Sequence, residues 1–227
     1  MNKLTHAEIE DYADDDFSSC PVYQKTKALS YEFDLNKDVD SQDKYVDLFR
    51  TLRSMTENDD ITIYIATSGG YLTTAIQLVA EIRNCKGHVH GVLASDCYSA
   101  GSIVFLSCHS QEVYEHASLM AHDAFGGAVG KISERVRQTN HDAERLRNLY
   151  HDVYKHFFTP EEIDRILSGV DDGWVLYDEI CDRLERRQEL EQKAAEENTQ
   201  YITYDDLMKM TKKDILSTLG VQSPDEM

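Results

Sequence analysis

The sequence has no hydrophobic run long enough to cross a membrane, since a transmembrane helix needs about 20 consecutive apolar residues and no segment approaches that length. It also lacks the basic and then apolar start of a secretory signal, because the chain opens with the polar, acidic stretch MNKLTHAEIEDYADDD. With 41% apolar and 29% charged residues, the composition is typical of a soluble globular protein. We therefore expect a cytoplasmic protein.

Basic residues are scarce. The 23 lysines and arginines are outnumbered by 42 aspartates and glutamates, which gives a formal net charge of −19. A protein that binds nucleic acid needs a basic surface against the phosphate backbone, so we expect no nucleic-acid partner. A charge of this size is compatible with high solubility or with attraction of basic partners.

The five cysteines do not form a recognisable pattern. Their number is odd, they are widely spaced, and no CxxC pair occurs, so free thiols in a reducing compartment are expected rather than a disulfide framework. Cys108, His109, His116 and His122 could be imagined as zinc ligands, but their spacing matches no common ligand pattern. The sequence thus predicts neither a metal site nor a cofactor.

Strand-like and helix-like segments alternate through the first half of the chain. The pattern predicts strand, helix, strand, helix and strand in this order: Lys27–Leu35, Ser41–Glu57, Ile61–Ala66, Tyr71–Asn84 and Val89–Ala94. Alternation of this kind implies right-handed crossover connections and a mostly parallel sheet within an α/β fold.

The second half is predicted to be mainly helical. The expected elements are a turn at Ser95–Tyr98, a helix opening at Ser99, a strand at Ala117–Ala121, a long helix at Lys131–Phe157, a short helix from Thr159, a loop at Gly169–Trp174, a helix at Tyr177–Asn198 and an amphipathic segment at Thr203–Leu219. We divide the chain into an acidic N-terminal arm (1–26), a core (27–184) and a charged helical C-terminal extension (185–227). The amphipathic segment in that extension either remains solvated or packs on a neighbouring subunit.

Ser99 and His122 are the candidate nucleophile and base. A serine on a turn between a strand and a helix has its hydroxyl exposed at the helix N-terminus, where free N–H groups favour a developing negative charge. His122 ends the next strand-like run, and the 23 residues between the two leave room for a helix, a turn and a returning strand. Serine and histidine in this order are typical of a nucleophile activated by a general base.

Such a pair also needs a carboxylate to orient the base and N–H donors for an oxyanion. Asp172 is the candidate carboxylate, with Asp171 as its competitor. The backbone of Gly69 and Gly70, between a strand and a helix, and the N–H of Ala100 are the candidate donors. Each signal taken singly has a purely structural explanation, such as a helix cap, a structural histidine or a turn-forming aspartate.

Four motifs in the same order resemble the proteolytic subunit of the Clp protease. The family's strand followed by Ser-Pro-Gly-Gly resembles Ile61–Gly70, with Ser68 in place of the proline. Its nucleophile turn resembles Cys97–Gly101, and its Met-Ile-His-Gln-Pro followed by Gly-Gly resembles Met120–Gly127. Its Arg-Asp-x-aromatic stretch resembles Asp171–Trp174.

This resemblance implies a serine endopeptidase that hydrolyses peptide bonds. The matched positions imply a catalytic triad of Ser99, His122 and Asp172, and an oxyanion hole formed by Gly70 and Ala100. The implied fold is that shared by Clp proteases and crotonases, built of repeated β-β-α units with a mostly parallel sheet and a long protruding helix. The family further implies peptide or unfolded protein substrates, assembly into a homo-oligomeric ring with the long helix as the contact between rings, and an ATP-dependent unfoldase as partner.

Two other functions remain open at this stage. A non-catalytic Clp-like assembly protein is suggested by Cys97 and Tyr98, which are bulkier than the two alanines that usually precede the serine. A viral capsid-maturation protease of the same type belongs with this alternative, since such proteases include Clp-like members. A crotonase-like acyl-CoA enzyme would also use strand-end glycine N–H groups, without a triad. The serine turn, the acidity and the absence of an evident basic patch for CoA count against that enzyme.

Overall fold

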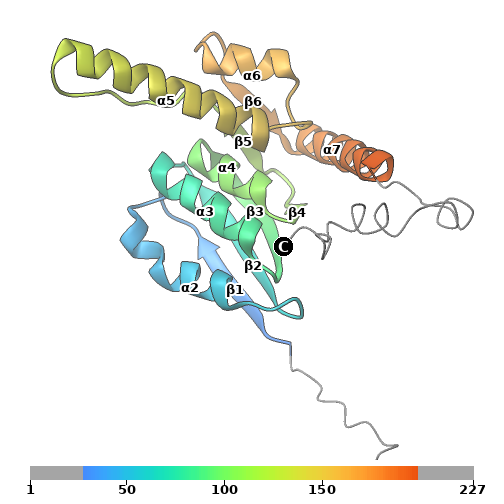
Figure 1. The fold of residues 1–227 in the computed structure, drawn as a ribbon. Helices are drawn as coiled ribbons and strands as arrows, with labels where there is room; N and C mark the ends of the chain where they lie inside the picture. Colours follow the sequence, from blue (N-terminus) through green and yellow to red (C-terminus); the bar gives the residue numbers. More distant parts are fainter. Residues whose placement is uncertain (1–27, 199–227) are drawn as a thin grey trace, which may run out of the picture.

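The computed structural model describes residues 28–198, which form one sheet with helices packed around it (Figure 1). The strands are β1 Ser30–Leu35, β2 Asp60–Thr67, β3 His88–Tyr98, β4 Ser110–Val113, β5 Ser118–Ala121 and β6 Gly173–Leu176. The helices are the 3₁₀ helix η2 Gln42–Tyr45, α2 Val46–Ser54, α3 Leu72–Asn84, α4 Ala100–Ser107, α5 Ile132–Val153, α6 Pro160–Leu167 and α7 Tyr177–Asn198.

The sheet is mostly parallel, as predicted. Its order is β1-β2-β3-β5-β6, and β4 pairs with β3 beside this path. The pairs β1–β2, β2–β3, β3–β4 and β3–β5 are parallel, whereas β5 and β6 run antiparallel. The α/β class, the mostly parallel sheet and the long helix expected from the sequence are thereby confirmed.

Strand β3 is longer than the sequence indicates, and the predicted turn at Ser95–Tyr98 is wrong. Residues 90–93 of β3 pair with β4, and its last three residues, 96–98, pair with β5. Burial does not alternate strictly here, because the β2–β3 ladder shifts register between Leu93 and Cys97 and leaves Ser95 and Asp96 both exposed. Cys97 is fully buried between the exposed Asp96 and the half-buried Tyr98. Ser95 and Asp96 resemble turn residues in the sequence because they are small and polar, but they are the solvent-facing residues of the strand.

Other boundaries also differ from expectation. The segment predicted as one helix at Ser41–Glu57 is divided into η2 and α2, and α5 ends at Val153 rather than Phe157. Strand β4 was not predicted, since Ser110–Val113 is short and largely polar. Trp174 lies in strand β6 rather than in a loop. Helix α7 has the predicted bounds, and α6 begins as expected at Pro160, with Thr159 accepting a hydrogen bond from the N–H of Glu162.

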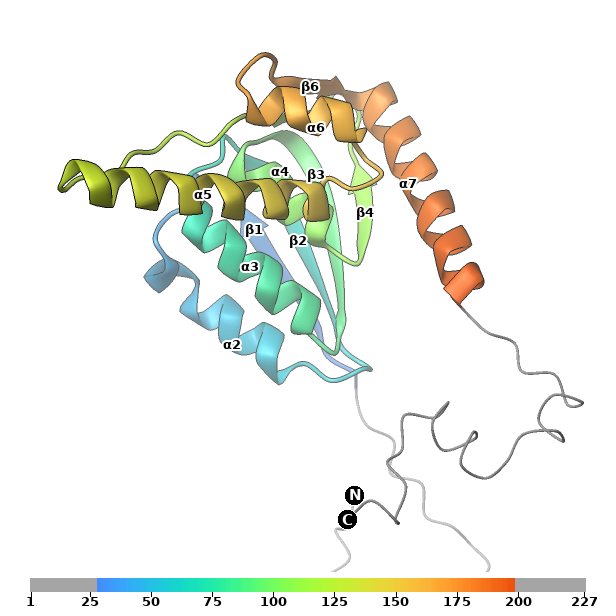
Figure 2. The same ribbon diagram turned by 45° about the horizontal axis from the view of Figure 1, so that its top comes forward.

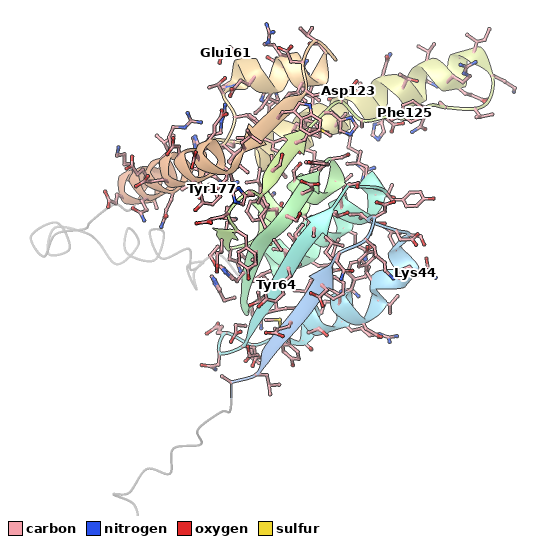
Figure 3. All side chains as sticks on the ribbon, turned by 180° about the vertical axis from the view of Figure 1, so that it is seen from behind. Lys44, Tyr64, Asp123, Phe125, Glu161 and Tyr177 are labelled. Carbon is pink, nitrogen blue, oxygen red and sulfur yellow. The ribbon has the colours of Figure 1, made fainter. Side chains whose placement is uncertain are left out.

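Helices α2, α3 and α4 cover one face of the sheet, while α5 runs past its end and projects beyond it (Figures 1 and 2). The inward side chains form one core; the largest fully buried are Tyr154, Phe105, Phe157, Leu52, Ile61 and Ile63. The opposite face of β1 and β2 carries Tyr64 among polar side chains (Figure 3). None of the helices within residues 28–198 is both long and apolar enough to cross a membrane.

Two sequence-based expectations lie outside the described residues. The acidic arm at 1–26 and the amphipathic segment at Thr203–Leu219 both fall there. The division of the chain at residues 26 and 184 therefore stays a prediction, although α7 continues across the second boundary.

Candidate active site

Ser99 occupies a strained turn between the end of β3 and the start of α4. Its backbone has φ 52° and ψ −121°, a positive φ that non-glycine residues rarely adopt. The N–H of Ser99 donates to the carbonyl oxygen of Met120 at 2.8 Å, which fixes the turn against β5. All eight residues of α4 are buried, so the serine is held by a helix that has little freedom to move.

Gly69 allows the end of β2 to approach this turn closely. It has φ +105°, and a Cβ added there would lie 2.6 Å from the Cβ of Ser99 and 2.8 Å from the carbonyl oxygen of Tyr98. Both the backbone conformation and the available space therefore require glycine. Because of this contact, the segment that follows β2 lies directly beside the nucleophile turn.

His122 lies within hydrogen-bonding distance of Ser99. Its Nε2 is 2.8 Å from the serine Oγ. For the imidazole to accept the hydroxyl proton, Nε2 must be unprotonated and the ring proton must sit on Nδ1. The structure thus brings together the nucleophile and base candidates at the distance that proton transfer requires.

Two backbone N–H groups beside the pair are unengaged. No hydrogen bond among the described residues uses the N–H of Gly70 or of Ala100. Val39 accounts for the orientation of the glycine: its N–H donates to the carbonyl of Gly69 and its carbonyl accepts from Tyr71, so the N–H of Gly70 points away from this neighbouring strand segment. Unpaired donors at such a position can bind an oxyanion.

These groups surround a cavity of about 700 Å³. Ser99, His122, Gly70 and Ala100 all line it. A second cavity, of about 410 Å³, lies between α3, α5 and the loop that Figure 3 marks by Asp123 and Phe125, and shares Leu72, Ala124 and Phe125 with the first. Its lining includes the apolar side chains of Leu72, Ile76, Leu146 and Leu149. The two cavities together could accept an extended chain with an apolar side chain.

Asp172 is the candidate residue whose side chain makes no hydrogen bond to the rest of the site within residues 28–198. Strands β5 and β6 pair Ala121 with Gly173, so His122 and Asp172 are the next residues beyond this pair. The Asp172 carboxylate nevertheless makes no hydrogen bond or ion pair within residues 28–198, and it lines a separate cavity with Trp174. Its competitor Asp171 accepts a 2.8 Å hydrogen bond from the Nε of Arg165.

The bulky pair before the serine does not obstruct the cavity. Cys97 is directed into the core, where burial raises the pKa of its thiol well above the ordinary value. Tyr98 packs edge-on against Trp174 with ring centroids 5.1 Å apart. Neither residue lines the cavity around Ser99.

Three polar side chains at the site were not anticipated from the sequence. The hydroxyl of Tyr150 donates to the carbonyl oxygen of His122 at 2.6 Å. The hydroxyl of Ser102 donates to the carbonyl oxygen of Ser99 at 2.7 Å and lies 2.8 Å from the hydroxyl of Tyr154. In the sequence both tyrosines read as core positions of the long helix, because nothing in a helical period distinguishes a buried hydroxyl with a partner from a buried ring.

A comparison with protein families finds a match for this chain. Residues 25–177, which are more than half of the sequence, match the family described as Clp protease. The matched region contains all five residues expected to act, together with Tyr150, Tyr154 and Ser102.

Proposed function

The chain belongs to the Clp protease family, and from this premise we propose that it is a serine peptidase in which Ser99 is the nucleophile and His122 the general base. The observation that carries the proposal is the 2.8 Å contact between the Ser99 Oγ and the His122 Nε2 at the wall of a cavity. The strained serine turn and the two unengaged N–H groups support it.

In the proposed reaction, His122 takes the hydroxyl proton as the Ser99 oxygen attacks a peptide carbonyl carbon. The N–H groups of Gly70 and Ala100 donate to the oxyanion, and each such donor typically contributes about 3 kcal/mol to the stability of the transition state. The C–N bond breaks as the imidazolium returns its proton to the leaving amine. Water, deprotonated by His122, then hydrolyses the acyl ester and restores the serine.

Asp172 is the residue we propose to orient the imidazole. Asp172 and His122 are each one position past Ala121 and Gly173, the last residues that pair between the antiparallel strands β5 and β6. Rotation of its side chain toward the Nδ1 of His122 would complete the triad. Asp171 is the weaker candidate because its carboxylate is already bound to Arg165.

Labelling with a fluorophosphonate, followed by intact mass measurement, tests the proposal. We expect one adduct on the wild-type protein and none on Ser99→Ala. Ser68→Ala is the matched control, since Ser68 lines the same cavity and makes no hydrogen bond to a histidine within residues 28–198, and it should be labelled like the wild type. Labelling of Ser99→Ala at the wild-type rate would refute the assignment of the nucleophile.

A matched pair of variants identifies the orienting carboxylate. We expect Asp172→Asn to slow labelling by a large factor, because the neutral amide cannot stabilise an imidazolium. Asp171→Asn should lose only the contact with Arg165, which is exposed to solvent and of small energetic weight. The reverse ranking of the two rates would assign the role to Asp171.

Oligomeric assembly, which the family implies, is proposed to involve α5 and the loop before it. Apolar side chains are exposed along this projecting segment: Phe125, Val129, Ile132 and Val136. Isolated exposed apolar residues are common, but four along one segment indicate a protein contact. Native mass spectrometry should give a multimer for the wild type and a smaller species for Ile132→Asp; an unchanged mass would remove α5 from the interface.

A non-catalytic assembly protein of the same family is the second candidate. The observation in its favour is the lack of a hydrogen bond between Asp172 and His122. It predicts no fluorophosphonate adduct on a correctly assembled wild-type protein. An ATP-dependent unfoldase as partner is a further proposal, to be tested by pull-down with the full chain.

A further inference from the structure

We propose that Tyr150 on α5 and Tyr154, the residue that directly follows this helix, are positioning residues that hold the backbones of His122 and Ser99 in register. This inference rests on the proposed function, because it assigns a role in aligning the pair that would carry out the reaction. The ring of Tyr150 lines the cavity around Ser99, but its hydroxyl is engaged by the His122 carbonyl, and Tyr154 does not line the cavity. Both hydroxyls would therefore act through the base and the nucleophile rather than on the substrate.

The backbone of His122 needs a support that the sheet does not supply. Strand β5 ends at Ala121, whose pairing with Gly173 is the last in the β5–β6 ladder. The carbonyl oxygen of His122 accepts a 2.6 Å hydrogen bond from the Tyr150 hydroxyl, and no other donor reaches it among the described residues. The hydrogen bond from Tyr150 therefore fixes the first residue beyond the β5–β6 ladder.

The Ser99 carbonyl accepts from the backbone N–H of Ser102 at 3.0 Å, and a second tyrosine adds to this support through the Ser102 side chain. The Ser102 hydroxyl donates its proton to the Ser99 carbonyl at 2.7 Å. With that proton engaged, the Ser102 oxygen can only accept from the hydroxyl of Tyr154, 2.8 Å away. The order of donation is therefore Tyr154 to Ser102 to Ser99, and it runs from the end of α5 to the strained serine turn.

The two tyrosines form one rigid unit. They are one helical turn apart, and their rings meet edge-on with centroids separated by 4.9 Å. Tyr150 is 2% exposed and Tyr154 is fully buried, and burial raises the pKa of each hydroxyl. Both hydroxyls therefore keep their protons as the pH changes, and a displacement of α5 would shift the serine and the histidine together.

Tyr150→Phe tests the support of the base. Misplacement of a catalytic group by about 1 Å can cost about 10²-fold in rate, so we expect the inactivation rate constant for the fluorophosphonate to fall by about 10- to 100-fold while its binding constant is unchanged. Tyr64→Phe is the matched control, because Tyr64 lies on the other face of the sheet (Figure 3). Equal rate constants in the two variants would overturn the role of Tyr150.

The support of the nucleophile is tested by separating alignment from stability. Ser102→Ala should lower both the rate constant and the melting temperature, since it leaves the buried Tyr154 hydroxyl without an acceptor. Adding Tyr154→Phe removes that unpaired group, so the melting temperature should recover. The rate constant should stay low in the double variant, because Ser99 still lacks the hydroxyl donor. If the rate constant of the double variant recovered together with its melting temperature, Ser102 and Tyr154 would contribute to stability and not to the alignment of Ser99.

A readout that needs no activity separates this inference from the proposed function. Hydrogen exchange measured over residues 118–125 should be faster in Tyr150→Phe than in Tyr64→Phe, because the segment loses its tie to α5. If the wild-type protein takes no label, the proposed function fails while this comparison still decides whether Tyr150 holds the segment. If the wild type is labelled and exchange is equal in the two variants, this inference fails alone.

Discussion

The strained backbone of Ser99 should make the nucleophile a source of instability. Its positive φ, at 52° with ψ −121°, lies outside the regions that residues with a Cβ favour, and strain of this kind costs of the order of 1–3 kcal/mol. Glycine at the same position would adopt the conformation without strain. Comparing Ser99→Gly with Ser99→Ala isolates this cost, because both variants lose the hydroxyl contact with His122.

The expected difference follows from three terms. Relief of strain favours the glycine variant by about 2 kcal/mol, the middle of the usual range. Greater freedom of glycine in the unfolded chain opposes it by about 0.5–1 kcal/mol. Loss of one half-buried methyl group subtracts roughly a further 0.4 kcal/mol, half of the usual value for a buried carbon. Ser99→Gly should therefore be more stable than Ser99→Ala by about 1 kcal/mol.

Equilibrium urea unfolding at one fixed protein concentration measures this difference. For a domain of this size it corresponds to a melting temperature higher by about 2–4 °C. The concentration must match because assembly adds to apparent stability. A glycine variant that unfolds at the same urea concentration as the alanine variant, or at a lower one, would refute the reasoning, since the turn would then carry no strain.

Two further predictions concern ionisable groups. Hydrogen bonding by Arg183 lowers the pKa of Glu162 from its ordinary 4.5 to about 2. The stability that this carboxylate contributes is therefore complete above about pH 4.5 and lost as the pH falls toward about 2. Urea midpoints of the wild type and Glu162→Gln should accordingly differ at pH 7 and converge near the lower end of that window; a constant difference would contradict the assignment. Burial raises the pKa of Cys108 to about 12, and that of Cys97 well above its ordinary value, so iodoacetamide should alkylate the half-exposed Cys181 in the folded protein and reach Cys97 and Cys108 only on unfolding. Peptide mapping that finds Cys97 modified in the folded protein would show that the core behind the serine opens.

Much of the fold was predictable because its strands and helices carry the periodicities that burial imposes. Strand β2 is a strictly alternating β-branched segment and α3 an amphipathic one, so both were located within a residue or two. The sequence failed where an element is short or polar. Strand β4 exists because β3 offers it a free edge, and its own residues indicate no strand. The end of β3 was misread for the converse reason, since its polar residues face outward.

The candidate site was predictable in part for a different reason. Ser99 and His122 each follow a strand, and the ends of parallel strands meet at one edge of a sheet. Their contact is therefore a consequence of topology that sequence order can suggest. The roles of Tyr150 and Tyr154 could not be predicted, because a hydroxyl finds its acceptor only when helix and sheet are packed. The orientation of the Asp172 side chain depends in the same way on local packing.

Strand β3 pairs first with β4 and then with β5, and the second pairing sets the distance between Ser99 and His122. β4 leaves the edge of β3 after Tyr114, whose N–H still donates to Leu93, and β5 joins that edge at residues 96–98. The chain at residues 115–117 is therefore a turn outside the ladder. Residues could be added there without moving Met120 from Tyr98, its partner in the ladder. The interval of 23 residues between Ser99 and His122 is thus incidental, and related chains with longer or shorter intervals could keep the same contact. A search for such sites by fixed spacing would overlook them, whereas a search for two strand ends on one parallel pair would not.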